Sequence, residues 1–386
     1  MAIEDKKPKV GDPQHGIKVF SPGRINLIGE HTDYNDGFVF PAAIDRGISF
    51  DLRRNGSPSV CEVYSADFDK RLRFDLGQVE RSEEEWENYI LGVIHELQIL
   101  GKRLKGFDCV IRSDLPIGAG LSSSAALECG LAYGLNELFG LGLTPLEIVR
   151  LGQRAEHNFV GTQCGIMDQY ASVLGREGHA LLLDCRSVTH RHVPIDLDPF
   201  TLLLLNTRVS HNLASGEYNR RRADCFEGVR VLNEKVGLGL ESLRDLAPEQ
   251  LDQYRHLLAP RIAKRCSYVL EENERVLNAS LALENNDLND FGQLLYASHK
   301  GLRDEYEVSC EELDFLVDFS RDRDYVLGSR MMGGGFGGCT LNLLHKEKVG
   351  EYIAEVSKAY SERFGLDPEP IPVHPAQGTQ LISDES

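Results

Sequence analysis

Apolar residues are arranged along the chain in two patterns, one typical of helices and one typical of strands. Leu127, Leu131, Leu135 and Leu138 recur at helical spacing and predict a helix over 125–139. Short apolar runs bounded by polar or glycine-containing segments are typical of strands. The strands that we expect from such runs lie at 19–28, 48–52, 107–112, 180–183 and 202–205. Helical and strand-like segments follow one another without a repeat, so the pattern predicts an α+β fold.

A second helix has a clear start signal. Thr144 can cap it, Pro145 fits its first turn, and Glu147 can reach back to the cap, which predicts a helix from Thr144 to about Val160. Further helices are expected at 220–236, 260–283 and 288–298, with a glycine-rich strand at 333–344.

The length of 386 residues exceeds the size at which one hydrophobic core stops growing, so we expect two domains with mixed sheets and helices. The stretch from His190 to Pro199 holds two prolines between apolar runs and is typical of a crossing between domains. We therefore predict an N-terminal domain over 1–195 and a C-terminal domain over 196–386.

Charge and cysteine usage narrow the function classes. The chain has 60 acidic and 42 basic residues and a formal charge of −18, which opposes binding to nucleic acid or an anionic membrane. Nine cysteines without a C-x-x-C spacing indicate reduced thiols. Residues 1–10 lack the apolar core of a secretory signal, and no apolar stretch approaches the ~20 residues of a membrane span. We expect a cytoplasmic protein.

A glycine- and serine-rich loop runs from Gly118 to Ser124, between the strand at 107–112 and the helix at 125–139. Free N–H groups at a helix start attract phosphate, and glycines allow a close approach. No lysine follows as a Walker loop requires, and Ser123 stands where a dinucleotide fingerprint needs Gly or Ala. A simple helix cap is the structural alternative.

The turn after the first strand carries Glu30, His31 and Asp33. Carboxylates accept hydrogen bonds and imidazole can donate or accept, so this trio can bind neighbouring sugar hydroxyls. A solvated polar turn is the alternative.

Glycines also fill the segment from Gly333 to Gly338, which fits G-x-G-x-x-G. The protein-kinase triplets at 290–292 and 247–249 stand in the wrong order, and no His-Arg-Asp loop exists. Because Met331, Met332 and Phe336 flank the glycines, we expect a packed loop rather than a flexible linker.

Two acidic residues complete the candidate chemistry. Asp168 lies among apolar residues, so its carboxylate must be partly desolvated and paired. Glu156, near the end of the second helix, could bind Mg²⁺ together with a serine hydroxyl, since Mg²⁺ prefers hard oxygen ligands. For Glu156, an exposed helix residue is the alternative.

The three motifs, at 22–34, 115–125 and 332–340, in their order and spacing resemble the galactokinase family of the GHMP small-molecule kinases. The chain departs from that pattern at Met332, where family members more often have Thr. The resemblance implies a two-domain α+β fold with the active site in the cleft between the domains.

The resemblance also implies roles for individual residues. Galactose would bind to Glu30, His31, Asp33, the Gly165 backbone and Tyr218. ATP would bind with its adenine near Trp86 and Tyr89 and its phosphates at Gly118, Ala119, Gly120, Leu121, Ser122, Ser123 and Ser124. Ser124 and Glu156 would hold Mg²⁺. Asp168 would orient or deprotonate the C1 hydroxyl, with Arg24 as its charge partner.

The implied reaction is direct in-line transfer of the γ-phosphate of ATP to the anomeric hydroxyl of D-galactose, giving α-D-galactose 1-phosphate for galactose catabolism. A kinase of the same superfamily for N-acetylgalactosamine or another sugar is one alternative. A non-catalytic galactose sensor is another, although such sensors lose residues next to the serine run and Ser124-Ala125 are present here. We expect a monomer, with an oligomer left open.

Overall fold

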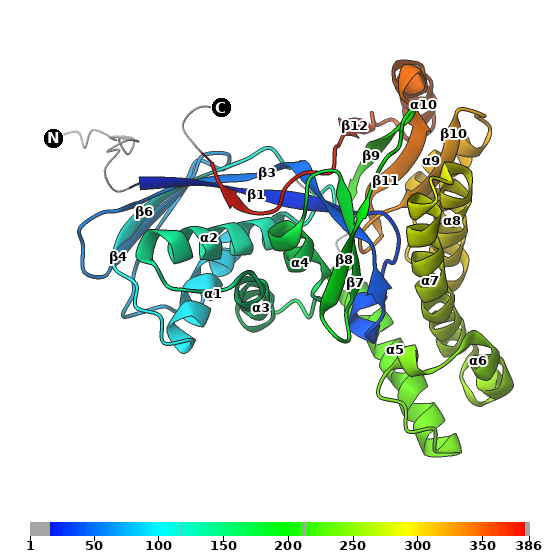
Figure 1. The fold of residues 1–386 in the computed structure, drawn as a ribbon, viewed down its shortest axis with the longest axis horizontal. Coiled ribbons are helices and arrows are strands. Elements are labelled where there is room, and N and C mark those ends of the chain that lie inside the picture. Colours follow the sequence, from blue (N-terminus) through cyan, green and yellow to red (C-terminus); the bar gives the residue numbers. More distant parts are fainter. Residues whose placement is uncertain (1–15, 117, 211–213, 383–386) are drawn as a thin grey trace.

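The computed structural model describes residues 16–116, 118–210 and 214–382. Two halves lie side by side, each built on its own sheet (Figure 1). The predicted absence of a secretory signal concerns residues 1–10, which lie outside the described residues. One position of the second motif, Ile117, lies outside them as well. Among the helices that are described, none is both long and apolar enough to cross a membrane.

The first half is built on a six-stranded sheet with the order β13-β1-β3-β6-β4-β5. Its strands are β1 (Gly16–Asn26), β3 (Pro41–Arg54), β4 (Val60–Ser65), β5 (Lys70–Asp75), β6 (Phe107–Ser113) and β13 (Gln380–Leu381). Only the β4–β6 pair is parallel within this sheet, so the sheet is mixed as predicted. The last strand, β13, brings the end of the described chain back to β1.

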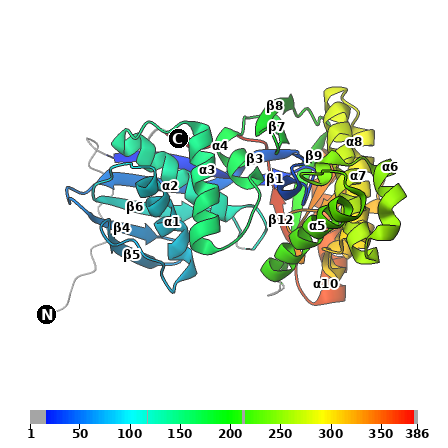
Figure 2. The same ribbon diagram turned by 90° about the horizontal axis from the view of Figure 1, so that it is seen from below.

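Four helices lie along one face of this sheet (Figures 1 and 2). They are α1 (Glu85–Ile99), α2 (Ser123–Phe139), α3 (Pro145–Ala155) and α4 (Met167–Leu174), with a π-helical turn η2 (Glu156–Val160) directly after α3. Helix α2 starts at the end of the glycine- and serine-rich loop. Helix α3 starts at the predicted capping box, in which Thr144 accepts from the Glu147 N–H.

A small antiparallel sheet, β2-β7-β8, and a larger antiparallel sheet, β10-β11-β9-β12, follow. The small sheet holds β2 (Phe38–Val39), β7 (His179–Asp184) and β8 (Thr189–Pro194), and η1 (Asp33–Asn35) precedes it. The larger sheet holds β9 (Phe200–Ser210), β10 (Val326–Met331), β11 (Gly337–His345) and β12 (Glu369–Pro372).

Helices dominate the second half (Figure 1). The α-helices are α5 (Ala214–Val236), α6 (Pro248–Tyr254), α7 (Pro260–Glu284), α8 (Leu288–Gly301), α9 (Glu311–Arg321) and α10 (Val349–Phe364). Single turns of 3₁₀- or π-helix are η3 (Leu243–Asp245), η4 (Arg255–Leu257), η5 (Leu302–Tyr306) and η6 (Lys346–Lys348).

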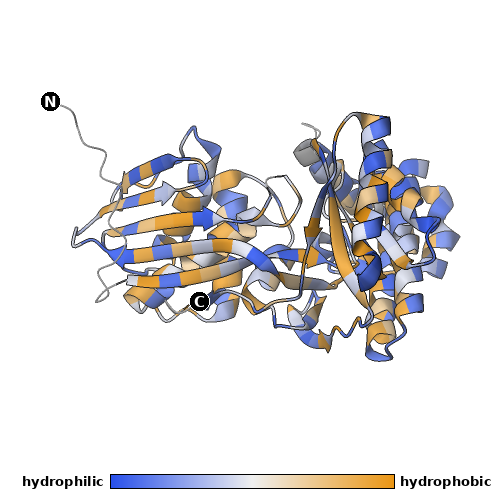
Figure 3. Cartoon of the chain, turned by 90° about the horizontal axis from the view of Figure 1, so that it is seen from above, coloured by the Kyte–Doolittle hydropathy of each residue, from blue (hydrophilic) through white to orange (hydrophobic). Residues whose placement is uncertain are grey.

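The core continues from one half into the other. Along β9, Leu202 and Leu204 belong to the large cluster that also contains β1, β3 and α2, whereas Leu203 and Leu205 pack with Leu316 of α9 and its neighbours. Since successive side chains of a strand point to opposite faces, the apolar run at 202–205 is buried on both faces. Polar and apolar residues interleave along the strands, and apolar ones collect where the layers meet (Figure 3).

Three predicted boundaries differ from the structure. The helix predicted over 220–236 begins at Ala214. The glycine-rich strand predicted at 333–344 begins at Gly337, because Gly333 and Gly335 have φ values of +85° and +87° and form a turn. The stretch 190–199 was expected to cross between the domains, but it belongs to β8 as far as Pro194. The chain enters the larger sheet only at Phe200, the start of β9. The division at residue 195 stays a prediction.

Candidate functional site

A pocket of about 280 Å³ lies between the two halves. Its walls come from the turn after β1, the loop before α4, helices α4 and α5, and the glycine-rich turn before β11. The lining residues are Arg24, Glu30, His31, Asp33, Glu156, Thr162, Cys164, Gly165, Met167, Asp168, Tyr218, Gly333, Gly334 and Gly335. The pocket therefore collects every residue that was expected to bind the sugar or to perform the chemistry, and we call it the polar pocket.

Arg24 and Asp168 form a two-point ion pair in the polar pocket. Arg24 Nε donates to Asp168 Oδ1 at 2.8 Å and Nη2 donates to Oδ2 at 3.0 Å. The Ser122 hydroxyl donates to Oδ2 at 2.5 Å, and the Gly120 carbonyl accepts from Arg24 Nη1 at 2.6 Å. The side chain of Asp168 is 27% exposed. The prediction of a partly desolvated, paired carboxylate is confirmed.

Glu30 is held by the glycine-rich turn and by a buried arginine. Its Oε1 accepts from the Gly333 N–H at 2.8 Å and lies 3.2 Å from Nη2 of Arg330. Arg330 is fully buried and also donates to the carbonyls of Asn26 and Leu27. A paired, buried Glu30 excludes the alternative of a solvated turn.

His31 is buried and uncharged. Burial lowers its pKa to about 3, and the positive charges of Arg221, Arg330 and Arg265 act in the same direction. Nδ1 hydrogen-bonds to the Tyr34 hydroxyl at 2.8 Å, while Nε2 has no hydrogen-bond partner among the described residues. A buried polar atom without a partner is costly, so Nε2 is suited to meet a polar group of a bound ligand.

Asp33 and Gly165 touch across the polar pocket. A Cβ added to Gly165 would lie 1.7 Å from Asp33 Oδ2, so only glycine leaves room for this carboxylate. Burial raises the pKa of Asp33 to about 7, and the charges of Asp168 and Glu30 add to that rise. Tyr218 approaches the same group from α5 and also lines the pocket.

Glu156 lines the polar pocket and is 7% exposed, so the alternative of an exposed helix residue is wrong. Its oxygens accept from Gln169 Nε2 at 2.9 Å and from the Ser124 hydroxyl at 3.4 Å. Burial, then the nearby charge of Asp168, raise its pKa to about 7. Glu128, fully buried with both oxygens unpartnered, has its pKa raised by burial and by Glu156.

A second pocket of about 420 Å³ adjoins the start of α2. Its lining is mostly apolar, with a few serines and one aspartate, and we call it the apolar pocket. The lining residues are Ile48, Ser65, Asp67, Phe68, Trp86, Tyr89, Ile111, Ser113, Leu115, Pro116, Ser123, Ser124 and Leu127. Trp86 and Tyr89, to which the resemblance gives the adenine of ATP, both line this pocket. Ser124 lines the apolar pocket and contacts Glu156 of the polar one, so the two pockets meet at this pair.

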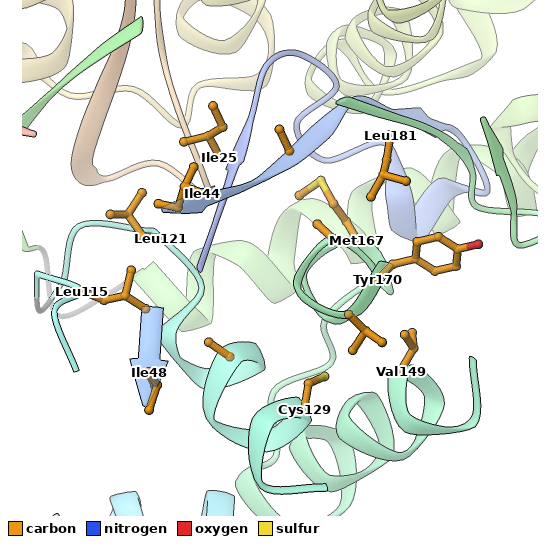
Figure 4. Close-up of a cluster of buried hydrophobic side chains, with 14 of the residues drawn as sticks. Ile25, Ile44, Ile48, Leu115, Leu121, Cys129, Val149, Met167, Tyr170 and Leu181 are labelled. Atoms are coloured by element: carbon orange, nitrogen blue, oxygen red, sulfur yellow. The ribbon is translucent and has the colours of Figure 1, made fainter. Parts of the chain in front are cut away.

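The loop between the pockets, from Gly118 to Ser124, has several residues with positive φ. Gly118, Gly120 and even Ser122 have φ between +59° and +73°, which turns the chain sharply into α2. Ala119 and Leu121 are buried, so they can offer a ligand only their backbone. Leu115 and Leu121 point into the apolar cluster beside the loop and so anchor it (Figure 4).

The glycine-rich turn is packed, as predicted. A Cβ at Gly335 would lie 2.1 Å from the Val308 carbonyl, and the Phe336 N–H donates to the same carbonyl at 2.7 Å. Met331 and Met332 are buried beside it.

Three residues at these pockets were missed by sequence reasoning. Gln169 directly follows Asp168, and Arg330 precedes the buried methionines. An arginine inside an apolar strand would have signalled a buried ion pair. Phe68 sits in a polar hairpin, where nothing in the sequence alone marks it.

Models of known protein families match three parts of the chain. A family model described as the galactokinase galactose-binding signature matches residues 8–53. Models described as the GHMP kinases N terminal domain and GHMP kinases C terminal match residues 88–176 and 279–362.

Full-length relatives are similar too. Galactokinases from Chloroflexus aurantiacus and Thermotoga maritima are 44% and 42% identical to the chain; the alignments cover 94% and 91% of it, and 92% and 96% of those proteins. The crystal structure of Lactococcus lactis galactokinase complexed with galactose has a TM-score of 0.91 at 37% identity, with 96% of each chain covered. Methanococcus jannaschii mevalonate kinase shares the fold alone, with a TM-score of 0.69 at 18% identity over 95% of this chain and all of that one.

The mixed α+β fold and its paired pockets thus define a kinase of the GHMP class. Relatives more than 40% identical align with nearly the full length of the chain. Within that class, the chain belongs to the galactokinase family.

Proposed function

We propose that the two pockets hold the two substrates of one reaction, the ATP-dependent phosphorylation of D-galactose at its C1 hydroxyl. The observation that carries this proposal is the junction of the pockets at Ser124 and Glu156. One pocket is lined by hydroxyl-binding groups and the other by apolar and aromatic groups, and a phosphate loop lies between them. The complex of the Lactococcus lactis relative with galactose supports the choice of sugar.

In the polar pocket, the proposed galactose ligands are Glu30, His31, Asp33, the Gly165 backbone and Tyr218. Glu30 is oriented by Gly333 and Arg330, and Asp33 by its close contact with Gly165. The neutral His31 presents its unpartnered Nε2. These groups can distinguish sugars that differ in the position of a hydroxyl. A sugar without a hydroxyl at the right position would leave a buried polar atom of the pocket unpaired.

Asp168 is the proposed partner of the C1 hydroxyl. Arg24 fixes the carboxylate plane by two hydrogen bonds, and Ser122 fixes one of its oxygens. A carboxylate held in this way accepts the hydroxyl hydrogen and orients the oxygen for in-line attack on the γ-phosphate. Phosphoryl transfer depends mainly on such positioning and on charge stabilisation.

Ser124 and Glu156 fit a magnesium ion, and we propose that they hold it. Both offer oxygen atoms, and the buried Glu156 carboxylate lacks a cation among the described residues. Within those residues no cluster of three or more His, Cys, Asp or Glu could hold a metal. A site with few protein ligands suits Mg²⁺, whose shell is completed by substrate phosphates and water. Bound Mg²⁺ neutralises charge on the phosphates.

We also propose where ATP binds. Its adenine lies against Trp86 and Tyr89 in the apolar pocket, and its phosphates lie at the loop from Gly118 to Ser124. Backbone N–H groups at the start of α2 and the helix dipole favour the phosphate charge.

Galactose-dependent ADP release tests the proposal. The purified chain with ATP and Mg²⁺ is assayed with galactose, N-acetylgalactosamine, arabinose and mevalonate. We expect rapid ADP release with galactose and much slower release with the others. Equal rates with all four, or none with galactose, would contradict the proposal, and sugar binding without ADP release would favour a sensor.

A cytoplasmic location also stays a proposal, supported by nine cysteines that are all free in the structure. The monomeric state and the domain division at residue 195 remain predictions.

A further inference from the structure

We propose that Phe68, at the tip of the β4–β5 hairpin, forms the stacking surface for the purine ring of the nucleotide. The inference rests on the proposed function, since it takes the apolar pocket as the nucleotide site. It adds a residue from outside the three motifs, contributed by a strand turn on the sheet side of the pocket.

Phe68 is unusually placed for a large apolar side chain. It is 54% exposed, yet it lines the apolar pocket together with Trp86 and Tyr89 of α1. An exposed phenylalanine gains little from folding, because its apolar surface stays in water. A planar ligand that entered the pocket would cover this ring.

The hairpin tip is held in place on both sides of Phe68. The Ala66 N–H donates to the Ile111 carbonyl at 2.9 Å, and Asp67 Oδ2 accepts from the Ser113 N–H at 2.7 Å. Beyond Phe68, Asp69 Oδ1 accepts from the Tyr64 hydroxyl at 2.7 Å. The first two bonds hold the backbone next to Phe68 at the end of β6, and the third closes the hairpin, so the stacking surface is formed before a ligand binds.

Two further aromatic rings, Trp86 and Tyr89 of α1, line the same pocket. The flat face of a purine suits an aromatic partner. Ser123 and Ser124, at the start of α2, also line the pocket, so a base bound there would have its phosphates near the loop.

Stacking reads the π-face of a base rather than its hydrogen-bonding edge, so Phe68 should serve different purine nucleotides alike. Removal of an aromatic stacking partner costs about 1–3 kcal/mol per base, which corresponds to roughly a 5- to 150-fold loss of affinity. We expect Phe68→Ala to weaken ADP and GDP binding by about tenfold each, and Phe68→Tyr to restore most of the affinity.

Trp86 is the single tryptophan of the chain, so its fluorescence reports directly on this pocket. Titration of the full chain with ADP or GDP, without any sugar, gives dissociation constants that do not depend on catalysis. The steady-state assay adds the KM for ATP and for galactose. Phe226→Ala is the matched control, because Phe226 is a 46% exposed phenylalanine on α5, outside the apolar pocket.

The expected result is a rise of about tenfold in the dissociation constants and in the KM for ATP with Phe68→Ala, with the KM for galactose and the melting temperature unchanged. Phe226→Ala should leave all four values unchanged. Unaltered nucleotide affinity in Phe68→Ala, or no rescue by Phe68→Tyr, would overturn the proposal. A wild-type chain that binds ADP but ignores galactose would instead contradict the proposed function and leave the role of Phe68 intact.

Discussion

At the residue scale, the four buried or half-buried carboxylates of the polar pocket have different environments. Glu30 is paired with Arg330 and accepts from the Gly333 N–H. Asp168 is paired with Arg24 and accepts from Ser122. Asp33 and Glu156 have no cation within ion-pair distance among the described residues, and burial raises the pKa of each to about 7. Carboxylates in different surroundings differ in protonation and can therefore serve different functions.

Asp168→Asn should separate binding from chemistry. The amide keeps the size of the carboxylate but loses its charge and basicity, so we expect kcat to fall by roughly 10²- to 10⁴-fold. The galactose dissociation constant should change by less than about threefold, as measured by calorimetry. Asp108→Asn is the control, because Asp108 forms another arginine pair, with Arg53 on the sheet. Near-normal turnover of Asp168→Asn would refute its role.

Gly165→Ala should damage sugar binding selectively. The new Cβ would occupy the place of Asp33 Oδ2, so Asp33 must rotate away. We expect galactose affinity to fall by roughly tenfold or more, the effect of losing a hydrogen bond to a charged group, while ADP affinity from Trp86 fluorescence is kept. In contrast, Gly350→Ala in α10 meets nothing within 4 Å and should leave sugar binding unchanged. Equal galactose affinity in both variants would contradict the placement of Asp33.

The raised pKa of Asp33 predicts a pH dependence of stability. The folded state keeps the Asp33 proton up to about pH 7, whereas the unfolded chain loses it near pH 4. The resulting stabilisation is complete below about pH 4 and is lost as the pH rises toward 7. Relative to Asp33→Asn, the ligand-free wild type should lose on the order of 3 kcal/mol of unfolding free energy between pH 5 and 8. Denaturant titrations measure the unfolding free energy of both proteins at each pH. The same pH dependence in the wild type and in Asp33→Asn would exclude the raised pKa of Asp33.

Sequence reasoning could reach the site as a set of residues but could not reach their contacts. Glu30, Asp33 and Asp168 are recognisable in the sequence as charged residues beside apolar runs. That they meet in one pocket is seen only in the folded structure. Gln169 acts through its contact with Glu156, on another helical segment, and Arg330 acts through its contact with Glu30, far away in the sequence. No local pattern encodes such distant pairs.

At the scale of elements, helices with local signals were predictable and others were not. The capping box at Thr144 and the leucine spacing of α2 gave two helices close to their observed ends. Helices α1, α4, α6, α9 and α10 were missed: α4 and α6 have only eight and seven residues, and α1, α9 and α10 start without a capping side chain. The π-helical turn that places Glu156 has no recognisable sequence signature.

Thr144→Ala tests whether the α3 cap serves stability alone. Thr144 and Glu147 satisfy each other's N–H groups at the exposed start of the helix, far along it from Glu156. Loss of the cap should lower the free energy of unfolding by about 1 kcal/mol. Denaturant titration should record that loss with kcat and both KM values unchanged. A drop in kcat would mean that the cap also positions Glu156.

At the scale of the whole molecule, the site depends on both halves. Glu30 and Asp168 come from the half with the six-stranded sheet, and Tyr218 and Gly333 come from the other. The buried Arg330 links β10 to the end of β1. The long-range joins, including the return of β13 to β1, could not be read from local patterns, because they depend on how the layers pack.

The central claim is that the joined pockets transfer the γ-phosphate of ATP to C1 of galactose. The most direct test is a ³¹P and ¹H NMR analysis of the product formed from galactose, ATP and Mg²⁺ by the purified chain. We predict a single sugar phosphate, α-D-galactose 1-phosphate, formed in equal amount to ADP. Phosphate at another carbon, or ADP released together with inorganic phosphate alone, would contradict the account.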